Sequence, residues 1–323
     1  MNPIKLFKAS TFTYTPFGNY IPGDLDFLSK NNIVLVDNVK DADVIISQNY
    51  KHLTKYFWRF IQKKKFLVWT NEPRFDTSFK ALKKIFFGLI KIHFMNIYTK
   101  DVFVSNLSFT AVLINKKLEL ITKISPEKTK NAVVLMSYYG GLNAPKLIRD
   151  GVNIDLITLR AYIATEGYKS SVMDIYGKGW PEGMSKENSR AGEWRTRKQT
   201  LLEPYKFNLC FENTIAFNYL TEKIWDSIES YCLPIYYGAG TNVYEIFPEN
   251  SFIDYSKFNN PKELFDYIEQ MPDSEYISRL NKCINVYNAI SEKGADLEHS
   301  ERKMVLEKIV QKLRFIVQRA NNK

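Results

Sequence analysis

The chain has 323 residues, of which 45% are hydrophobic and 25% charged, a composition that excludes a disordered or fibrous protein and suits two globular domains. With only three histidines, far apart, a His-built zinc site or a Ser-His-Asp triad is disfavoured. The net charge of +10 lies within residues 1–125, where 19 Lys and Arg stand against 9 Asp and Glu, and it predicts either an anionic partner or a solvated basic surface.

The cellular setting is predicted from what the sequence lacks. No run of 18 or more uncharged apolar residues predicts a membrane span, and the start MNPIKLFKAS lacks the apolar core of a signal peptide. The cysteines are odd in number and form no CxxC pair, so we expect them to be buried and reduced. We therefore expect a cytoplasmic protein, peripheral at the inner face of the membrane if its basic part or its end helix contacts lipid.

Short apolar runs alternate with longer amphipathic ones, a pattern that favours parallel sheets covered by helices. The predicted strands are 33–36, 44–47, 66–70, 102–105, 133–137, 172–176, 207–211, 234–237 and 252–254. The predicted helices are 52–64, 79–92, 157–166, 219–230 and 261–270.

The polar stretch 123–131, which contains Pro126 and has no apolar period, predicts a domain boundary. We expect an α/β fold in which residues 1–125 and 126–300 form two doubly wound, Rossmann-like domains that face each other across a cleft. Residues 301–323 predict an amphipathic helix with Val305, Ile309, Leu313 and Ile316 on one face. Packing of this helix against a domain is favoured over binding to a membrane surface.

Residues 51–66 and 79–94 mix basic with aromatic side chains. For each stretch the favoured interpretation is an amphipathic core helix with a basic outer face. Weak contact with a membrane comes second. Nucleic acid comes third and is not expected as a partner, because no RRM, KH, OB or helix-turn-helix signature accompanies the charge.

Residues 205–255 predict a ligand site at the carboxyl ends of two strands. Glu212 and Asn213 end the strand 207–211, a helix begins near Tyr219, and Glu222 and Lys223 lie in its first turn. A lysine opposes the dipole at that place unless an anion is bound. The next strand ends in a loop containing Gly238 and Gly240, where backbone N–H groups could approach a ligand. The alternative is that Glu222 and Lys223 are ordinary exposed helix residues.

The strings FNLCFEN, YLTEK, PIYYG and SFI within this segment resemble the donor-binding motif of the α1,3-fucosyltransferases, glycosyltransferase family 10. The similarity covers about fifty residues with little shift in spacing. A weaker similarity extends through VMDIYGKGW at 172–180. Further upstream, Arg160 matches the family's diphosphate-binding arginine by its distance from Asn213.

This resemblance implies a GT-B fold whose carboxyl-terminal domain binds GDP-fucose. Lys223 and Arg160 would hold the diphosphate, and Glu222 the ribose hydroxyls. Asn213 and Tyr219 would bind nearby nucleotide or phosphate groups, with Glu212, Gly238 and Gly240 in the donor loop. The amino-terminal domain would bind an oligosaccharide or glycolipid acceptor. No cofactor is required, although Mn²⁺ or Mg²⁺ stimulates some relatives; no clear Asp-x-Asp element is present.

Transfer to a hydroxyl needs a base in the acceptor domain, and Glu72 is the candidate. It follows the strand 66–70 in a loop stiffened by Pro73, and the family has a carboxylate near a proline at a similar place. Asp76 is the reserve candidate, and the alternative for Glu72 is an exposed loop glutamate. A single displacement would invert the anomeric configuration.

The resulting hypothesis is an inverting fucosyltransferase of bacterial surface glycan synthesis, acting in lipopolysaccharide biosynthesis or protein glycosylation. Three alternatives stay open. The chain could be a GT-B enzyme that uses another GDP-sugar or a UDP-sugar, a basic nucleic-acid-binding protein, or a non-catalytic relative that only binds sugar nucleotide.

Overall fold

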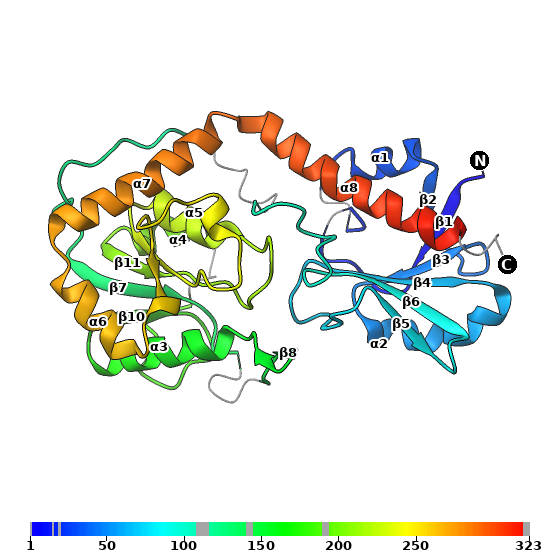
Figure 1. Cartoon of the computed structure of the whole chain (residues 1–323), viewed down its shortest axis with the longest axis horizontal. Coiled ribbons are helices and arrows are strands. Elements are labelled where there is room, and N and C mark those ends of the chain that lie inside the picture. Colours follow the sequence, from blue (N-terminus) through cyan, green and yellow to red (C-terminus); the bar gives the residue numbers. More distant parts are fainter. Residues whose placement is uncertain are drawn as a thin grey trace. The chain divides into compact units, whose positions relative to one another are not determined.

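The computed structural model describes residues 2–14, 16–18, 21–107, 116–139, 145–188 and 194–318 (Figure 1). Its contacts divide the chain into two compact units. The first unit combines Met1–Ser105 with His299–Lys323, and the second is Asn106–Glu298. Each unit is built on its own mainly or wholly parallel sheet with helices on its faces, which confirms the predicted α/β class with two Rossmann-like units.

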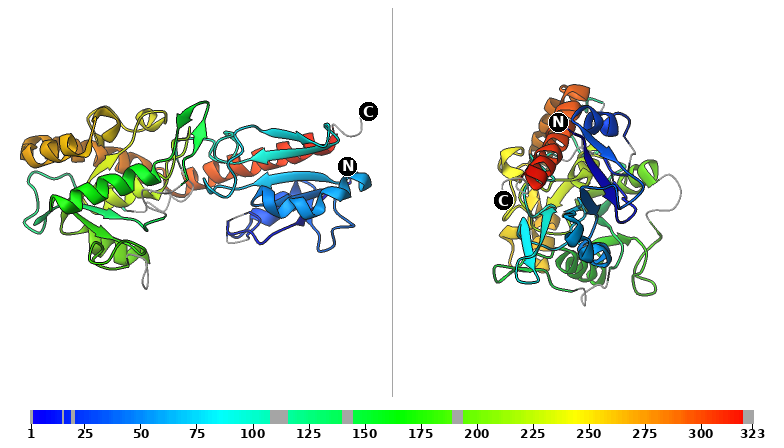
Figure 2. Two further views of the ribbon diagram at one scale, coloured as in Figure 1. Left: turned by 90° about the horizontal axis from the view of Figure 1, so that it is seen from below. Right: turned by 90° about the vertical axis from the view of Figure 1, so that its right-hand side faces the viewer.

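The first unit has a six-stranded sheet in the order β2-β1-β3-β4-β6-β5. Its neighbouring strands are parallel except for the pair β5 and β6. The strands are β1 (Ile4–Lys8), β2 (Ile33–Leu35), β3 (Val44–Ser47), β4 (Lys65–Trp69), β5 (Leu82–Ile85) and β6 (Ile90–Met95). The helices are α1 (Asp24–Lys30), α2 (Tyr50–Leu53), the 3-10 helix η1 (Thr54–Gln62) and the part of α8 (Gly294–Gln318) from His299 onward. Figures 1 and 2 show α8 and α2 on opposite faces of this sheet.

The helix predicted over 79–92 is wrong, because this stretch contains the antiparallel hairpin of β5 and β6. In β6 the side chains of Ile90, Ile92 and Phe94 alternate along the strand and join the same apolar cluster as Phe66 and Val68 of β4, while Met95 at the end of the strand is also buried. This period of two is that of a strand. The predicted strand 102–105 is also wrong: Val102 and Phe103 are buried, but this described segment pairs with no strand.

The second unit has a five-stranded parallel sheet in the order β10-β7-β11-β12-β13. Its strands are β7 (Lys130–Leu135), β10 (Met173–Tyr176), β11 (Tyr205–Leu209), β12 (Leu233–Tyr236) and β13 (Ile253–Asp254), with a separate pair of β8 (Ile148–Arg149) and β9 (Val152–Asn153). Its helices are α3 (Ile157–Lys169), α4 (Trp194–Leu202), α5 (Glu222–Glu229), α6 (Pro261–Gln270) and α7 (Asp273–Ser291), with two short 3-10 turns at Val243–Glu245 and Tyr255–Lys257.

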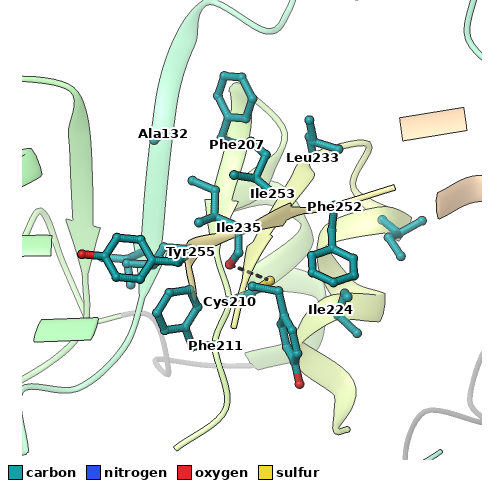
Figure 3. Packing of buried hydrophobic residues seen from close by; sticks show 14 of the residues in the cluster. Ala132, Phe207, Cys210, Phe211, Ile224, Leu233, Ile235, Phe252, Ile253 and Tyr255 are labelled. Atoms are coloured by element: carbon teal, nitrogen blue, oxygen red, sulfur yellow. Dashed lines mark hydrogen bonds between the residues drawn. The ribbon is translucent and has the colours of Figure 1, made fainter. Parts of the chain in front are cut away.

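A continuous apolar core lies between this sheet and its helices. Figure 3 shows Phe207, Phe211, Ile224, Ile235 and Phe252 among the buried residues of this core. The predicted burial of the cysteines is confirmed, since all three are buried and free, and the Cys210 thiol donates to Ile235 O at 3.6 Å. This core fixes the loops that follow the two strands.

The observed division differs from the predicted boundary at 125/126. The described residues 116–139 pack with the second unit, where Leu118 N donates to Asn288 Oδ1 at 2.8 Å and Ile121 N donates to Asn281 Oδ1 at 2.9 Å. The polar stretch 123–131 belongs there too, since Lys128 Nζ donates to Ser230 O at 2.7 Å. The polar composition of this stretch marks a surface segment and not the division between the units.

The predicted end helix is not a separate piece. Val305, Ile309, Leu313 and Ile316 are buried, and from His299 the helix α8 belongs to the first unit, while residues 319–323 lie outside the described residues. The favoured interpretation of this helix, packing against a domain, is confirmed. Its apolar face is therefore unavailable to a membrane.

Candidate active site

The candidate site lies at the carboxyl edge of the second sheet. Glu212 and Asn213 follow β11, and the segment 154–156 runs antiparallel beside them. Leu156 N donates to Asn213 O at 3.2 Å, and Ile215 N donates to Ile154 O at 2.9 Å. This pairing places the first turn of α3 against the end of β11, which is why Arg160 meets a residue 53 positions further along the chain.

Arg160 is a buried cation with neutral hydrogen-bond partners. Its Nη1 donates to Phe211 O, and its Nη2 donates to Asn213 Oδ1 at 2.9 Å. Within the described part of the chain no carboxylate lies within 4.0 Å of the guanidinium, and the buried Nε makes no hydrogen bond. Burial lowers the pKa of the Arg160 guanidinium, and the charges of Glu212 and Asp155 oppose that shift. The group thus carries a charge that its bonded partners do not cancel.

Glu212 is the centre of a second set of contacts, although its side chain is only 2% exposed. It accepts hydrogen bonds from Thr221 N at 2.8 Å, from Lys223 Nζ at 2.8 Å and from the Tyr236 hydroxyl at 3.2 Å. The Thr221 hydroxyl also lies 2.8 Å from both of its carboxylate oxygens. A buried carboxylate needs such partners to remain charged. Glu212 therefore ties the start of α5 to the ends of β11 and β12.

Lys223 lies in the first turn of α5, as predicted, and its charge is offset from within the protein. Besides the bond to Glu212, its Nζ donates to Thr221 Oγ1 at 2.7 Å and lies 3.7 Å from Glu222 Oε1. Burial lowers the pKa of Lys223, but the charges of Glu212 and Glu222 outweigh it and raise the pKa overall. The expectation that this lysine needs a bound anion against the helix dipole is therefore corrected, because Glu212 already supplies one. The Lys223 side chain is 21% exposed, and the bonds to Glu212 and Thr221 use two of the three donors of its ammonium, which leaves one donor for a further acceptor.

Glu222 is the more exposed carboxylate, at 35% of its side chain. Partial burial raises the pKa of its carboxyl, but Lys223 and Lys198 lower it by more, to about 2. Glu222 is therefore ionised at neutral pH, and its oxygens can accept hydrogen bonds from a ligand.

Tyr219 and the two glycines occupy the loops around this cluster. Tyr219 is buried, and its hydroxyl interacts electrostatically with both Arg160 and Tyr236. The Gly238 N–H already donates to Asp254 Oδ1 at 2.9 Å, which corrects the expectation that this amide is free for a ligand. Gly240 has a φ of +74°, and a Cβ there would lie 2.7 Å from Ile215 Cγ2, so this glycine allows the loop to pack.

Three contributors were not predicted: Asp155, Thr221 and Tyr236. Asp155 accepts from Thr158 N at 2.9 Å and so fixes the start of α3. An Asp two residues before a helix, and a Thr directly before one, are capping signals that the sequence contains. Tyr236 carries no comparable signal, because only the adjacency of β11 and β12 brings its hydroxyl to Glu212.

Glu72 lies in the first unit, directly after β4, at the carboxyl edge of that sheet. Its carboxylate accepts a hydrogen bond from the Tyr14 hydroxyl, and its own N–H donates to Thr70 Oγ1 at 3.1 Å. The reserve candidate, Asp76, is buried and accepts from Asn96 Nδ2 at 2.7 Å and from Ser78 Oγ at 3.1 Å. Burial raises the pKa of Asp76. Asp76 thus organises its loop, and Glu72 is the half-buried carboxylate of the two.

Metal-binding clusters and membrane-spanning helices are both absent from the described residues. These residues contain no group of three or more His, Cys, Asp or Glu placed to hold a metal ion. Across the same residues, none of the helices combines the length and the apolar character that a membrane span requires.

Comparison with known proteins identifies a related family. Residues 155–292 match the family model described as Glycosyltransferase family 10 (fucosyltransferase) C-term. An Alpha-(1,4)-fucosyltransferase of Arabidopsis thaliana is 31% identical over 153 residues, which are 46% of this chain and 36% of that protein. The Alpha-(1,3)-fucosyltransferase FucT of Helicobacter pylori is 45% identical over 74 residues, 23% of this chain and 15% of that protein. The chain thus spans about a third or less of the length of these relatives.

Among solved structures, a crystal structure of an alpha1,3-fucosyltransferase with GDP-fucose aligns with a TM-score of 0.49 and 20% identity, over 95% of this chain and 91% of that one. The family resemblance predicted from residues 205–255 is confirmed by the matching family model and by these sequence relatives.

Proposed function

Since residues 155–292 carry the carboxyl-terminal domain of glycosyltransferase family 10, we propose that this chain is a fucosyltransferase that uses GDP-fucose. In this proposal the two Rossmann-like units form a GT-B enzyme. The second unit binds the donor, and the first binds an oligosaccharide or glycolipid acceptor. The relatives named above support fucose as the transferred sugar.

The observation that carries the proposal is the buried guanidinium of Arg160. A buried cation whose hydrogen-bond partners are the neutral oxygens of Phe211 and Asn213 is suited to an anionic ligand. It lies at the carboxyl edge of a doubly wound sheet, where such folds bind nucleotides. Lys223, whose side chain is partly exposed in the same loop cluster, would supply a second positive charge.

Each group has a distinct task in the proposed transfer. The bond between the anomeric carbon and the diphosphate oxygen breaks, and its electron pair leaves on the diphosphate. Arg160 and Lys223 stabilise that developing negative charge without reorganising at the moment of reaction. Glu222, ionised at neutral pH, accepts hydrogen bonds from ribose hydroxyls. Asn213 and Tyr219 line the nucleotide, while Glu212, Gly238 and Gly240 shape the loops that hold the donor.

Glu72 is the proposed base. It accepts the proton of the acceptor hydroxyl as the oxygen bonds to the anomeric carbon from the side opposite the leaving diphosphate, which inverts the configuration. The hydrogen bond from Tyr14 supports this assignment, because it fixes one carboxylate oxygen and leaves the other to accept a proton. The base is thus provided by the first unit and the donor site by the second.

The decisive test is sugar transfer from GDP-fucose, with N-acetyllactosamine as acceptor probe and nuclear magnetic resonance to identify the product anomer. We expect an α-fucosylated product from the wild type and at least a roughly hundredfold lower kcat for Glu72→Gln. A Glu182→Gln variant, at an exposed site of the second unit, serves as control. Repeating the assay with EDTA and with added Mn²⁺ or Mg²⁺ tests whether a metal stimulates the enzyme. A β-linked product, or full activity in Glu72→Gln, would contradict the proposed mechanism.

The biological setting of the proposal is surface glycan synthesis in the bacterial cytoplasm, as lipopolysaccharide biosynthesis or protein glycosylation. The bacterial relative, which is 45% identical over its matched segment, supports this setting, and the three free, buried cysteines are compatible with a reducing compartment. No nucleic-acid partner is proposed. Transfer from GDP-mannose in place of GDP-fucose would identify the alternative, a related enzyme with another GDP-sugar.

A further inference from the structure

The hairpin of β5 and β6 lies at the edge of the first sheet (Figure 1). Its turn is apolar and exposed. The side chains of Phe86, Phe87 and Leu89 are 62%, 108% and 66% exposed. The turn is closed by a hydrogen bond from Gly88 N to Ile85 O at 3.1 Å. Three large apolar side chains therefore extend into solvent at one point of the surface.

The backbone of this turn is strained at both phenylalanines. Phe86 and Phe87 have φ values of 49° and 55°, in the left-handed region that bulky residues rarely adopt. Hairpin turns of this geometry favour Asn-Gly, because those residues adopt positive φ at low cost. An exposed Asn-Gly pair would also be more polar than the exposed pair Phe86 and Phe87. Strain at an exposed aromatic pair points to a role of these side chains outside the fold.

Lysines surround this turn without acidic partners. Lys84 and Lys91 lie directly opposite each other on β5 and β6, a like-charge pair that destabilises the hairpin. Lys65 on β4 lies beside Lys91, because the next residues along these parallel strands, Phe66 and Ile92, are paired. Lys84, Lys91 and Lys65 thus form a row across three neighbouring strands. Burial, together with the charges of Lys91 and Lys63, lowers the pKa of Lys65, so these ammonium groups act on one another. In the described structure none of these four lysines forms an ion pair.

The stretch of sequence that contains these lysines is basic as a whole. Residues 51–100 contain twelve Lys and Arg against two Asp and Glu. Ile61, which is 74% exposed, lies just before Lys63 at the end of η1. We call the surface made by Ile61, Lys63, Lys65, Lys84, Phe86, Phe87, Leu89 and Lys91 the tip surface. It lies where β4 and β6 begin, whereas Glu72 follows the opposite end of β4.

We propose that the tip surface docks on an anionic lipid bilayer, with Phe86, Phe87 and Leu89 in the interface and the lysines at the headgroups. Aromatic side chains prefer the boundary between headgroups and acyl chains, and each lysine near an anionic surface adds attraction. Docking in this way directs the carboxyl edge of the first sheet, with Glu72, away from the bilayer. The inference does not depend on the proposed sugar transfer.

Protection of the sheet edge explains only part of this surface. Lysines on an edge strand prevent pairing with another sheet, and β5 is an edge strand. That function does not require the exposed Phe86 and Phe87, which would favour association. The combination of an apolar tip with a basic surround is what an anionic membrane complements.

Co-sedimentation of the full chain with lipid vesicles tests the proposal. One set of vesicles contains phosphatidylcholine alone, and the other contains a mixture with phosphatidylglycerol. The first variant, Phe86→Asn with Phe87→Gly, removes the aromatic groups and gives the turn its favoured residues, so folding is retained. The second, Lys84→Glu with Lys91→Glu, reverses the charge but keeps a like-charge pair across the hairpin, so stability is matched. Lys169→Glu with Lys262→Glu, at exposed sites of the second unit, is the charge control.

We expect the wild type to sediment with the anionic vesicles only. The affinity of each tip variant for these vesicles should be at least roughly tenfold lower, and the charge control should bind like the wild type. High salt should release the wild type. Failure of the wild type to bind anionic vesicles, or unchanged binding by both tip variants, would overturn the proposal. A dimer that is lost in Phe86→Asn with Phe87→Gly, without vesicle binding by the wild type, would assign the surface to a second copy of the chain instead.

Discussion

At the scale of single residues, the two cations of the candidate site are held by different means. Lys223 is bonded to the buried carboxylate of Glu212, whereas Arg160 is bonded to the neutral oxygens of Phe211 and Asn213. Burying an ion without an opposite charge is expensive, and the cost falls when an anionic ligand binds. Donor affinity is therefore expected to depend more on Arg160, and the stability of the ligand-free protein more on Glu212.

The change Glu212→Gln tests the second part of this statement. Gln can accept fewer of the surrounding hydrogen bonds and leaves Lys223 without its closest opposite charge. We expect a loss of about 2 kcal/mol in the free energy of unfolding, measured by urea denaturation. Glu203→Gln, at an exposed position shortly before β11, is the control. An unchanged midpoint in Glu212→Gln would mean that Glu212 does not hold the start of α5.

Glu222 makes the free energy of unfolding depend on pH in the acidic range. Its pKa is about 2 in the folded chain against an ordinary value of 4.5, because Lys223 and Lys198 favour the ionised form over the opposing effect of burial. A lowered pKa stabilises the fold above about pH 4.5, and that contribution is lost as the pH falls toward 2. The wild type should therefore exceed Glu222→Gln in stability near neutral pH, with the difference shrinking over this window. A difference that stays constant on acidification would contradict the assigned charges.

At the scale of elements, the turn that follows β10 depends on one glycine. Gly177 has a φ of 148°, and a Cβ there would lie 2.0 Å from Met136 O, a backbone atom that cannot move aside. We expect Gly177→Ala to lower the free energy of unfolding by about 4 kcal/mol or more. Gly183→Ala is the matched control, since its φ of 80° is also positive but nothing lies within 4 Å of the added Cβ. That variant should lose only about 1 kcal/mol, the cost of the backbone conformation. Equal losses in thermal unfolding would show that the close contact is absent.

Element prediction succeeded where the local pattern was decisive. The strand 44–47 and the helix 261–270 have the predicted bounds, because each is an apolar or amphipathic run with clear ends. The hairpin of β5 and β6 was predicted as a helix, since its charged and apolar residues also fit a period near four. Only the pairing of Lys84 with Lys91 and of Phe66 with Ile92 decides between them, and such pairing is a tertiary property.

The sequence predicts which residues belong to the candidate site but not all of their contacts. The resemblance to the family's donor-binding motif implies Arg160, Asn213, Glu222 and Lys223 as site residues, and the structure brings the first two into direct contact and bonds Lys223 to Glu212. The function of Glu212 as a buried counter-charge was not foreseen, because burial of the carboxylate depends on the adjacency of β11 and β12. The same reason explains why the Gly238 amide was expected to be free, although it is bonded to Asp254.

At the scale of the whole molecule, the end of the chain completes the first unit. The Arg302 guanidinium on α8 bonds to the carboxylate of Asp24, which is 1% exposed, and donates to Pro22 O at 2.8 Å. We expect Arg302→Ala to lower the free energy of unfolding by about 2 kcal/mol, because Asp24 loses a cation. Lys303→Ala, on the adjacent exposed position, should change it by less than about 0.5 kcal/mol. Similar unfolding curves for the two variants would show that α8 is not fixed to α1 by this ion pair.

This arrangement also explains why the domain limits were misjudged. A segment that returns from the end of the chain to the first unit is invisible to an analysis that reads composition along the sequence. The contacts of Arg302 with Asp24 and Pro22 link residues about 280 positions apart, and no local pattern encodes them.

Calorimetric titration of the full chain most directly tests the proposal that the second unit binds a GDP-sugar at Arg160 and Lys223. GDP, GDP-fucose, GDP-mannose and UDP would be titrated into the wild type, Lys223→Ala and the control Lys169→Ala, which alters an exposed lysine of α3. We expect the wild type to bind GDP and GDP-fucose but not UDP to a comparable degree. We expect the affinity to be at least about tenfold weaker in Lys223→Ala and unchanged in the control. Equal binding of UDP, or undiminished GDP binding by Lys223→Ala, would contradict the proposal.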